Sequence, residues 1–151
     1  MTSYLSYADA ATVARHVRIL NPLAASDIDE CDRGKLESAL AAPQAGFGDY
    51  EKYESLAQKA GALLYAVAKA HGCPNGNKRL AYVLTVAFLM RNEFMLWADP
   101  DEVREKVEEI TATDAKDADA VREALGEWFA TRLVADVEAH VRLQAGQKLG
   151  G

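Results

Sequence analysis

The stretch His71-Gly-Cys-Pro-Asn-Gly-Asn-Lys-Arg79 separates two strongly helical runs, and it decides how the rest of the chain is expected to pack. Before it, apolar residues recur on one helical face: Leu56, Ala60, Leu63, Leu64 and Val67. His71 continues this face at the helix end, and Gly72 and Pro74 stop the helix. After Gly76, a second helix carries its own stripe: Leu80, Val83, Leu84, Ala87 and Phe88. Its other side is scarcely more polar, which predicts a helix in the middle of a bundle.

Further helices are predicted on both sides of this pair. Apolar periodicity predicts a helix over residues 8–20, and Asp32 is placed to cap a short helix that ends before Pro43. Residues 24–32 have no usable periodicity and are predicted as a loop. Residues 44–49 are predicted as a mobile connection, in which Phe47 either covers a ligand or, as is commoner for an aromatic ring, packs down.

The C-terminal third predicts two more helices after an extended piece at residues 94–97. Asn92 is a candidate left-handed stop for the preceding helix, and Asp99-Pro100 opens the next one. A long last helix is expected from residue 113 or 114 to 141, with Trp97 and Trp128 in the core. Four acids are interpreted as a solvated helix face: Glu102, Glu105, Glu108 and Glu109.

Length and composition favour one all-α domain. The chain has 151 residues, of which 50% are hydrophobic and 8% aromatic, which is typical of closely packed helices. We therefore expect a bundle of about six helices over residues 1–143, with the motif turn and its helix at the centre, and a flexible C-terminal tail at 144–151.

Charge and cysteine content exclude several classes of partner. A net charge of −6 offers no broad attraction for nucleic acid or for an anionic membrane. No apolar run is long enough to cross a membrane, and the N-terminus lacks the features of a signal peptide. Cys31 and Cys73 are too few to indicate a disulfide framework or a zinc site, so we expect a reducing, cytoplasmic compartment.

The start of the second motif helix is suited to binding an anion. The first amides of a helix have no intrahelical acceptor and the positive end of the helix dipole lies there. Gly76 and Asn77 stand at this point, and Lys78 and Arg79 add cationic donors. The residue pattern therefore predicts a phosphate site over Gly76–Arg79.

His71 is expected to lie beside the same site, because the few intervening residues must reverse the chain. A neutral imidazole there can take the proton of a hydroxyl as its oxygen attacks phosphorus. The pattern indicates phosphoryl or nucleotidyl transfer, although a histidine at a helix end and a basic helix start also occur in inert proteins. Cys73 is interpreted as a small buried residue rather than a thiolate nucleophile.

The nine residues resemble the motif of the Fic/Doc superfamily, His-x-Phe-x-Asp/Glu-Gly-Asn-Gly/Lys-Arg, and specifically its Doc (death-on-curing) toxin branch, in which lysine replaces the last glycine. Residues 33–43 and 88–92 resemble further Doc segments, so the likeness covers about residues 8–133. It implies a Fic-type helical fold with His71 as general base. It also implies that a nucleotide phosphate is bound by Asn75, Gly76, Asn77, Lys78 and Arg79.

The implied activity is that of a bacterial or phage toxin. Fic enzymes generally transfer a nucleotide monophosphate to a protein hydroxyl, whereas Doc-type toxins are linked to transfer of the terminal phosphate. Lys78 favours the kinase-like reaction, with ATP or another nucleoside triphosphate as donor, a host protein as acceptor and an antitoxin protein as a further partner.

Two positions depart from the family pattern. The acidic residue that helps to hold Mg²⁺ is Asn75 here, and an amide oxygen ligates a metal without adding charge, so we expect weak metal affinity. Cys73 stands at the position where the family has the phenylalanine that anchors the motif in the core. These departures leave two alternatives: a catalytically degenerate Fic-fold protein that binds a protein partner, and a protein nucleotidyltransferase that transfers AMP.

Overall fold

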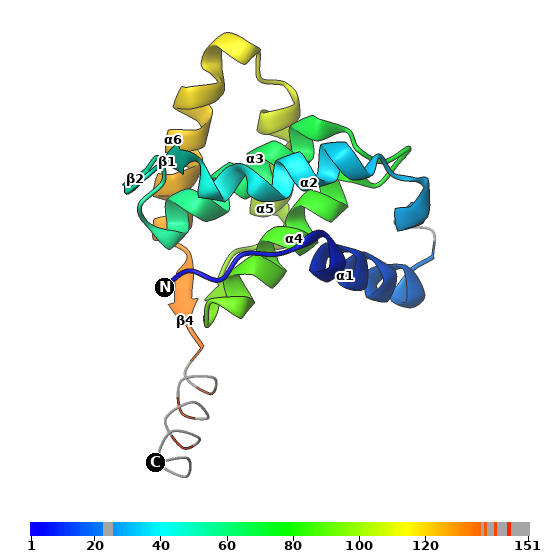
Figure 1. Cartoon of the computed structure of the whole chain (residues 1–151), viewed down its shortest axis with the longest axis horizontal. Coiled ribbons are helices and arrows are strands. Elements are labelled where there is room, and N and C mark those ends of the chain that lie inside the picture. Colours follow the sequence, from blue (N-terminus) through cyan, green and yellow to red (C-terminus); the bar gives the residue numbers. More distant parts are fainter. Residues whose placement is uncertain (23–25, 137, 139–140, 142–144, 146–151) are drawn as a thin grey trace.

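The computed structural model describes residues 1–22, 26–136, 138, 141 and 145. Within them the chain forms six α-helices, which confirms the predicted all-α class (Figure 1). The helices are α1 (Tyr7–Leu20), α2 (Arg33–Ala41), α3 (Leu56–Ala70), α4 (Asn77–Arg91), α5 (Pro100–Thr111) and α6 (Ala118–Ala130). No helix among the described residues is long and apolar enough to span a bilayer.

Helix α3 is the centre of the packing and contacts α2, α4, α5 and α6. Its start is set by a capping box, in which Ser55 Oγ accepts from the amide of Gln58 and the Gln58 side chain accepts from the amide of Ser55. Gly61 lets α6 approach closely, because a Cβ at this position would lie 3.0 Å from the backbone nitrogen of Gly126. The helix carrying His71 is therefore held on several sides.

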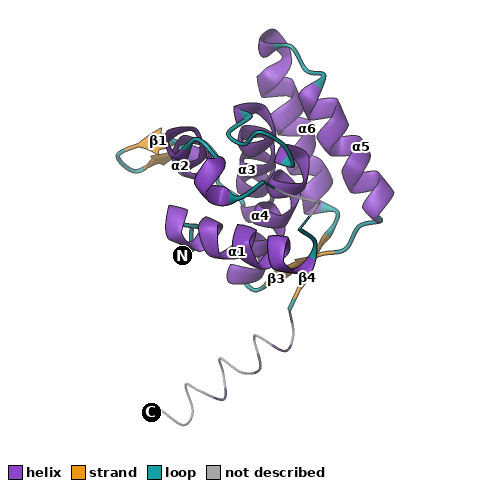
Figure 2. Ribbon diagram, turned by 90° about the vertical axis from the view of Figure 1, so that its right-hand side faces the viewer, coloured by secondary structure: helices purple, strands orange, loops and turns teal. Residues whose placement is uncertain are grey.

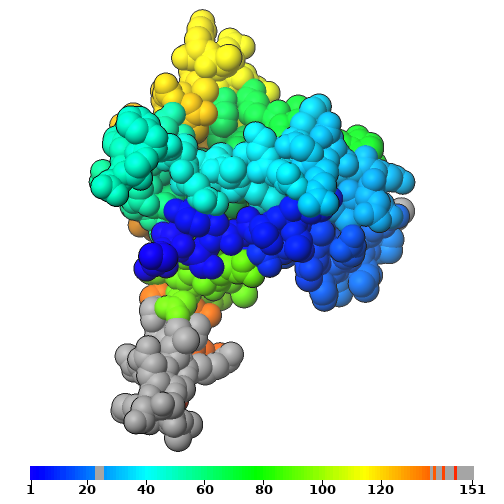
Figure 3. Space-filling view, in the orientation of Figure 1, coloured from blue at the N-terminus to red at the C-terminus, as the bar shows by residue number. Residues whose placement is uncertain are grey.

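Helix α4 packs against α1, α3 and α5, as predicted for a helix in the middle of the bundle. Its buried residues are Leu80, Ala81, Leu84, Thr85, Phe88 and Leu89. On the face shown in Figure 3, α1 and α2 lie side by side, and a short hairpin forms one margin of the molecule.

The hairpin replaces the mobile connection predicted at residues 44–49. After a 3₁₀ turn at Ala42–Gln44, β1 (Gly46–Phe47) pairs antiparallel with β2 (Tyr50–Glu51) and projects from the helical body (Figure 2). The prediction that Phe47 packs down was wrong, since its side chain is 81% exposed and its ring pairs with that of Tyr50. The hairpin and the motif turn lie at opposite ends of α3, a helix of 15 residues and so about 22 Å long.

A second small sheet corrects the predicted C-terminal helix. Helix α6 ends at Ala130, and β4 (Leu133–Ala135) then pairs antiparallel with β3 (Phe94–Leu96). This pairing joins segments distant in sequence, so local periodicity does not reveal it. Strand alternation also explains the exposure of Trp97, which was predicted to be core: Met95 and Trp97 face outward, while Phe94 and Leu96 are more buried.

Three smaller predictions were wrong or lie beyond the described part. The left-handed residue after α4 is Glu93 rather than Asn92. The segment predicted as a loop before α2 contains a 3₁₀ turn, η1 (Ile28–Glu30), which buries Ile28. The tail predicted at residues 144–151 lies outside the described residues except for Ala145.

Candidate active site

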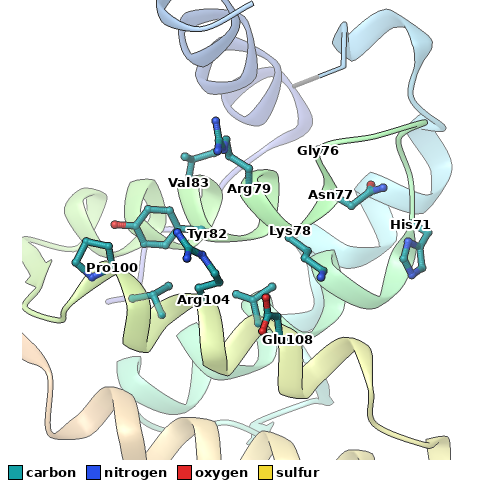
Figure 4. Close-up of a pocket in the computed structure, with 12 residues that line it drawn as sticks. His71, Gly76, Asn77, Lys78, Arg79, Tyr82, Val83, Pro100, Arg104 and Glu108 are labelled. Carbon is teal, nitrogen blue, oxygen red and sulfur yellow. The ribbon is translucent and has the colours of Figure 1, made fainter. Parts of the chain in front are cut away.

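A cleft of about 770 Å³ opens between the start of α4 and the side of α5 (Figure 4). It brings together five of the six site residues predicted from the sequence, namely His71, Gly76, Asn77, Lys78 and Arg79. Asn75 is the exception, because it does not line the cleft. The other walls come from α4 and α5: Tyr82, Val83, Pro100, Val103, Arg104, Val107 and Glu108.

The turn between α3 and α4 has an unusual backbone at its first residue. His71 is the C-cap of α3 and adopts a left-handed conformation with φ of 44°, which is uncommon for a residue with a side chain. Its imidazole is exposed rather than part of the buried stripe, and it lines the cleft. The left-handed step thus moves the histidine from the core-facing side of α3 to the site.

Asn77 closes the turn with its side chain. Its Oδ1 accepts from the amide of Cys73 at 2.9 Å, and its Nδ2 donates to the carbonyl oxygen of Cys73 at 2.8 Å. Gly76, with φ of 72°, then allows the chain to enter α4. The Asn77 side chain is therefore engaged in holding the turn, and the group it offers to an anion is its backbone amide.

The turn is attached to residues 26–32 at three points. The amide of Asp32 donates to the carbonyl oxygen of Gly72 at 2.6 Å, and Gly72 packs so closely on Leu36 that a Cβ would lie 2.9 Å from that side chain. Ser26 Oγ accepts from the amide of Asn75 and lies 3.0 Å from the Asn75 side-chain oxygen. The third point is a covalent bond.

Cys31 and Cys73 form a disulfide, with their Cα atoms 4.2 Å apart. The prediction that both cysteines are reduced is therefore contradicted. The error has a simple cause: the residues are 42 positions apart, and only the packing of η1 against the motif turn brings them together. Cys73 is nearly buried, as predicted, but it is bonded rather than a free thiol.

The start of α4 lines the cleft together with His71. Lys78 reaches into the space between α4 and α5, toward Glu108, and His71 lies at the neighbouring end (Figure 4). The guanidinium of Arg79 points away from Lys78, on another side of α4. A phosphate over the first turn of α4 would therefore meet the helix amides and Lys78, with Arg79 reaching it only after a change of rotamer.

Sequence reasoning missed the wall formed by α5. Pro100, Val103, Arg104, Val107 and Glu108 recur at helical spacing along one side of α5 and line the cleft. Glu108 lines the cleft while remaining exposed, as predicted for a solvated acid. Glu102 was misread as a solvated acid, because it accepts hydrogen bonds from Arg132 and from Trp128 Nε1, and these lower its pKa.

The donor set does not fit a resident magnesium ion. Mg²⁺ prefers carboxylate oxygens, water and substrate phosphates. Asn75, the predicted ligand, turns toward Ser26, and Glu108 is the one carboxylate among the described residues that line the cleft. No group of three or more candidate metal ligands occurs in the described part of the chain.

The fold and the motif geometry agree with comparisons to known proteins. The Fic/DOC family model matches residues 5–89, which include the motif, the turn and most of α4. This chain belongs to the Fic/DOC family.

Within that family, the chain is similar to a curated toxin along most of its length. The chain is 32% identical over 123 residues to Toxin Doc of Mycolicibacterium smegmatis, and the match covers 80% of this chain and 89% of the relative. No solved structure matches the chain significantly.

Proposed function

We propose that this protein is a Doc-like toxin that transfers a phosphate from a nucleoside triphosphate to a hydroxyl of a host protein. The observation that carries the proposal is the arrangement of His71 and Lys78 on either side of the first amides of α4, at the mouth of the cleft. The likeness to Toxin Doc supports the class of protein.

The residues of the cleft have separate roles in the proposed reaction. The amides at the start of α4 and Lys78 hold the phosphates by charge and hydrogen bonds. His71 accepts the proton of the incoming hydroxyl as that oxygen attacks the terminal phosphorus, and the nucleoside diphosphate leaves. Tyr82 and the apolar side of α5 offer a surface for the nucleoside. A divalent ion would enter bound to the nucleotide, and no step depends on a metal held by the protein.

Labelled nucleotide tests the proposal directly. The protein is incubated with bacterial lysate and ATP labelled at either the α- or the γ-phosphate, over a range of Mg²⁺ concentrations. Transfer of the γ-label to a protein supports phosphorylation, whereas transfer of the α-label identifies the nucleotidyl alternative. H71A is expected to abolish labelling, and H16A is the matched control, because His16 is an exposed histidine on α1. Absence of both labels would contradict an enzymatic function.

A partner-binding role is the second candidate, and a specific observation favours it. Position 75 of the motif is an asparagine rather than an acid, and it faces Ser26 rather than the cleft. A degenerate Fic-fold protein would act by binding alone, and H71A would then be as toxic on expression as the parent.

We also propose an antitoxin partner and action in the bacterial cytoplasm. Both are tested by expressing the protein in the bacterial cytoplasm together with the product of a neighbouring small gene, which should abolish toxicity.

A further inference from the structure

The disulfide lies at the base of the candidate phosphate site. Cys73 stands two residues after His71, and Asn77 binds both its backbone N–H and its carbonyl oxygen. Cys31 follows η1, outside the motif. The bond therefore connects the peptide on which the turn closes to a separate segment of the fold.

The other attachments of the turn are weak by comparison. Pro74 and Asn75 are exposed, so the hydrogen bonds between Ser26 and Asn75 compete with water. The Asp32 to Gly72 hydrogen bond fixes only the beginning of the turn. Cys73 is the residue of the turn that both points into the core cluster and is covalently held. Loss of the bond would leave the middle of the turn without a strong anchor.

We propose that the Cys31–Cys73 disulfide is a positioning element for the phosphate site, and that its reduction loosens the turn and weakens nucleotide binding. The nucleotide part rests on the proposed function. A disulfide in a protein of the reducing cytoplasm is more often a redox-sensitive bond than a permanent staple. The bond would make phosphate binding depend on the redox state of the cell.

The chemistry needs a dithiol reductant as the second reactant. One of its thiolates attacks the sulfur of Cys31, which is the more exposed of the two, and the bond to Cys73 breaks. Cys73 leaves as a thiolate and takes up a proton. The second thiolate of the reductant then displaces Cys31, which is also protonated, and the reductant ends as a disulfide.

The test compares the full chain in its oxidised form, after reduction with dithiothreitol, and as the double variant C31S/C73S. Alkylation and intact mass count the free thiols. Hydrogen exchange is followed for the amides of residues 72–79, with α6 as an internal control, because α6 does not line the cleft. ATP affinity is measured by calorimetry.

We expect no free thiols in the oxidised protein and two after reduction. Exchange at residues 72–79 should rise several-fold in both the reduced protein and C31S/C73S, with α6 unchanged, and the ATP dissociation constant should rise about tenfold, a typical coupling between sites. Exchange that is the same in all forms, or two free thiols that never form a bond, would overturn the inference. If no form binds ATP, the proposed function fails, while thiol counting and exchange still decide the positioning role. Should the double variant not fold, the reduced wild-type chain carries the same comparison.

Discussion

Substitution of Asn77 by aspartate removes one donor from the motif turn at nearly constant shape. In N77D the carboxylate still accepts from the amide of Cys73, but it faces the Cys73 carbonyl oxygen without the Nδ2 group that donates to it at 2.8 Å. Leaving a part-buried carbonyl oxygen unpaired costs about 1–3 kcal/mol, and repulsion between the two oxygens adds to it. We expect the turn to open and the protein to lose about that much unfolding free energy.

N77D should also weaken ATP binding, by more than the loss of folded protein accounts for. A loss of 1–3 kcal/mol in the pre-organised turn corresponds to about a 5- to 150-fold higher dissociation constant. The new charge at the start of α4 opposes an anion as well. N77A loses both hydrogen bonds without adding charge, whereas N77D keeps the one from the Cys73 amide. Weaker ATP binding by N77D than by N77A would therefore reveal the charge effect.

A matched asparagine supplies the control. Asn92 also clamps backbone with its amide, donating to the carbonyl oxygens of Ser3 and Phe88 and accepting from the amide of Ser3, but it does not line the cleft. N92D should lower stability by a similar amount in urea denaturation and leave ATP affinity unchanged in calorimetry. Two results would contradict this role of Asn77: an unfolding free energy of N77D within about 0.5 kcal/mol of wild type, or an equal loss of ATP affinity in N92D.

Four further substitutions test the packing and the ion pairs. G61A should cost about 1–3 kcal/mol by forcing α6 away from α3, and an unchanged urea midpoint would contradict the close approach. Hydrogen bonds from Arg91 and then from Ser6 hold the pKa of Asp9 well below its ordinary 3.8. D9N should therefore cost about 1 kcal/mol at pH 7, and in stability measured against pH this deficit should shrink as pH falls below 3.8; a constant deficit argues against the pair. Lys59 is buried and pairs with the exposed Glu51 of the hairpin. Thermal denaturation should find K59M nearly neutral and E51A destabilised by about 1 kcal/mol, since only E51A leaves a buried charge uncompensated; the reverse order would refute this.

Most of the fold could be predicted from the family motif and from the helical periodicity of apolar residues. The apolar stripes of α3 and α4 and the cap at Asp32 follow local rules, and the helices formed where those rules placed them. The errors at Phe47, at Trp97 and after α6 share a different origin. Each depends on which face of a short strand is buried against another part of the chain. The sequence of such a strand alone does not show whether an apolar residue lies on the buried or on the exposed face.

In the candidate site, too, some features follow from local sequence and others from the packing of distant segments. The order of residues from His71 to Arg79 was enough to predict an anion site at the start of a helix beside a histidine, because helix termini and chain reversal are local properties. Only the tertiary structure decided that α5 forms the opposite wall, that Asn75 turns to Ser26 and that Cys31 bonds Cys73. The last two contacts join residues 49 and 42 positions apart. Their partners are chosen by how the helices pack, which no local pattern in the sequence records.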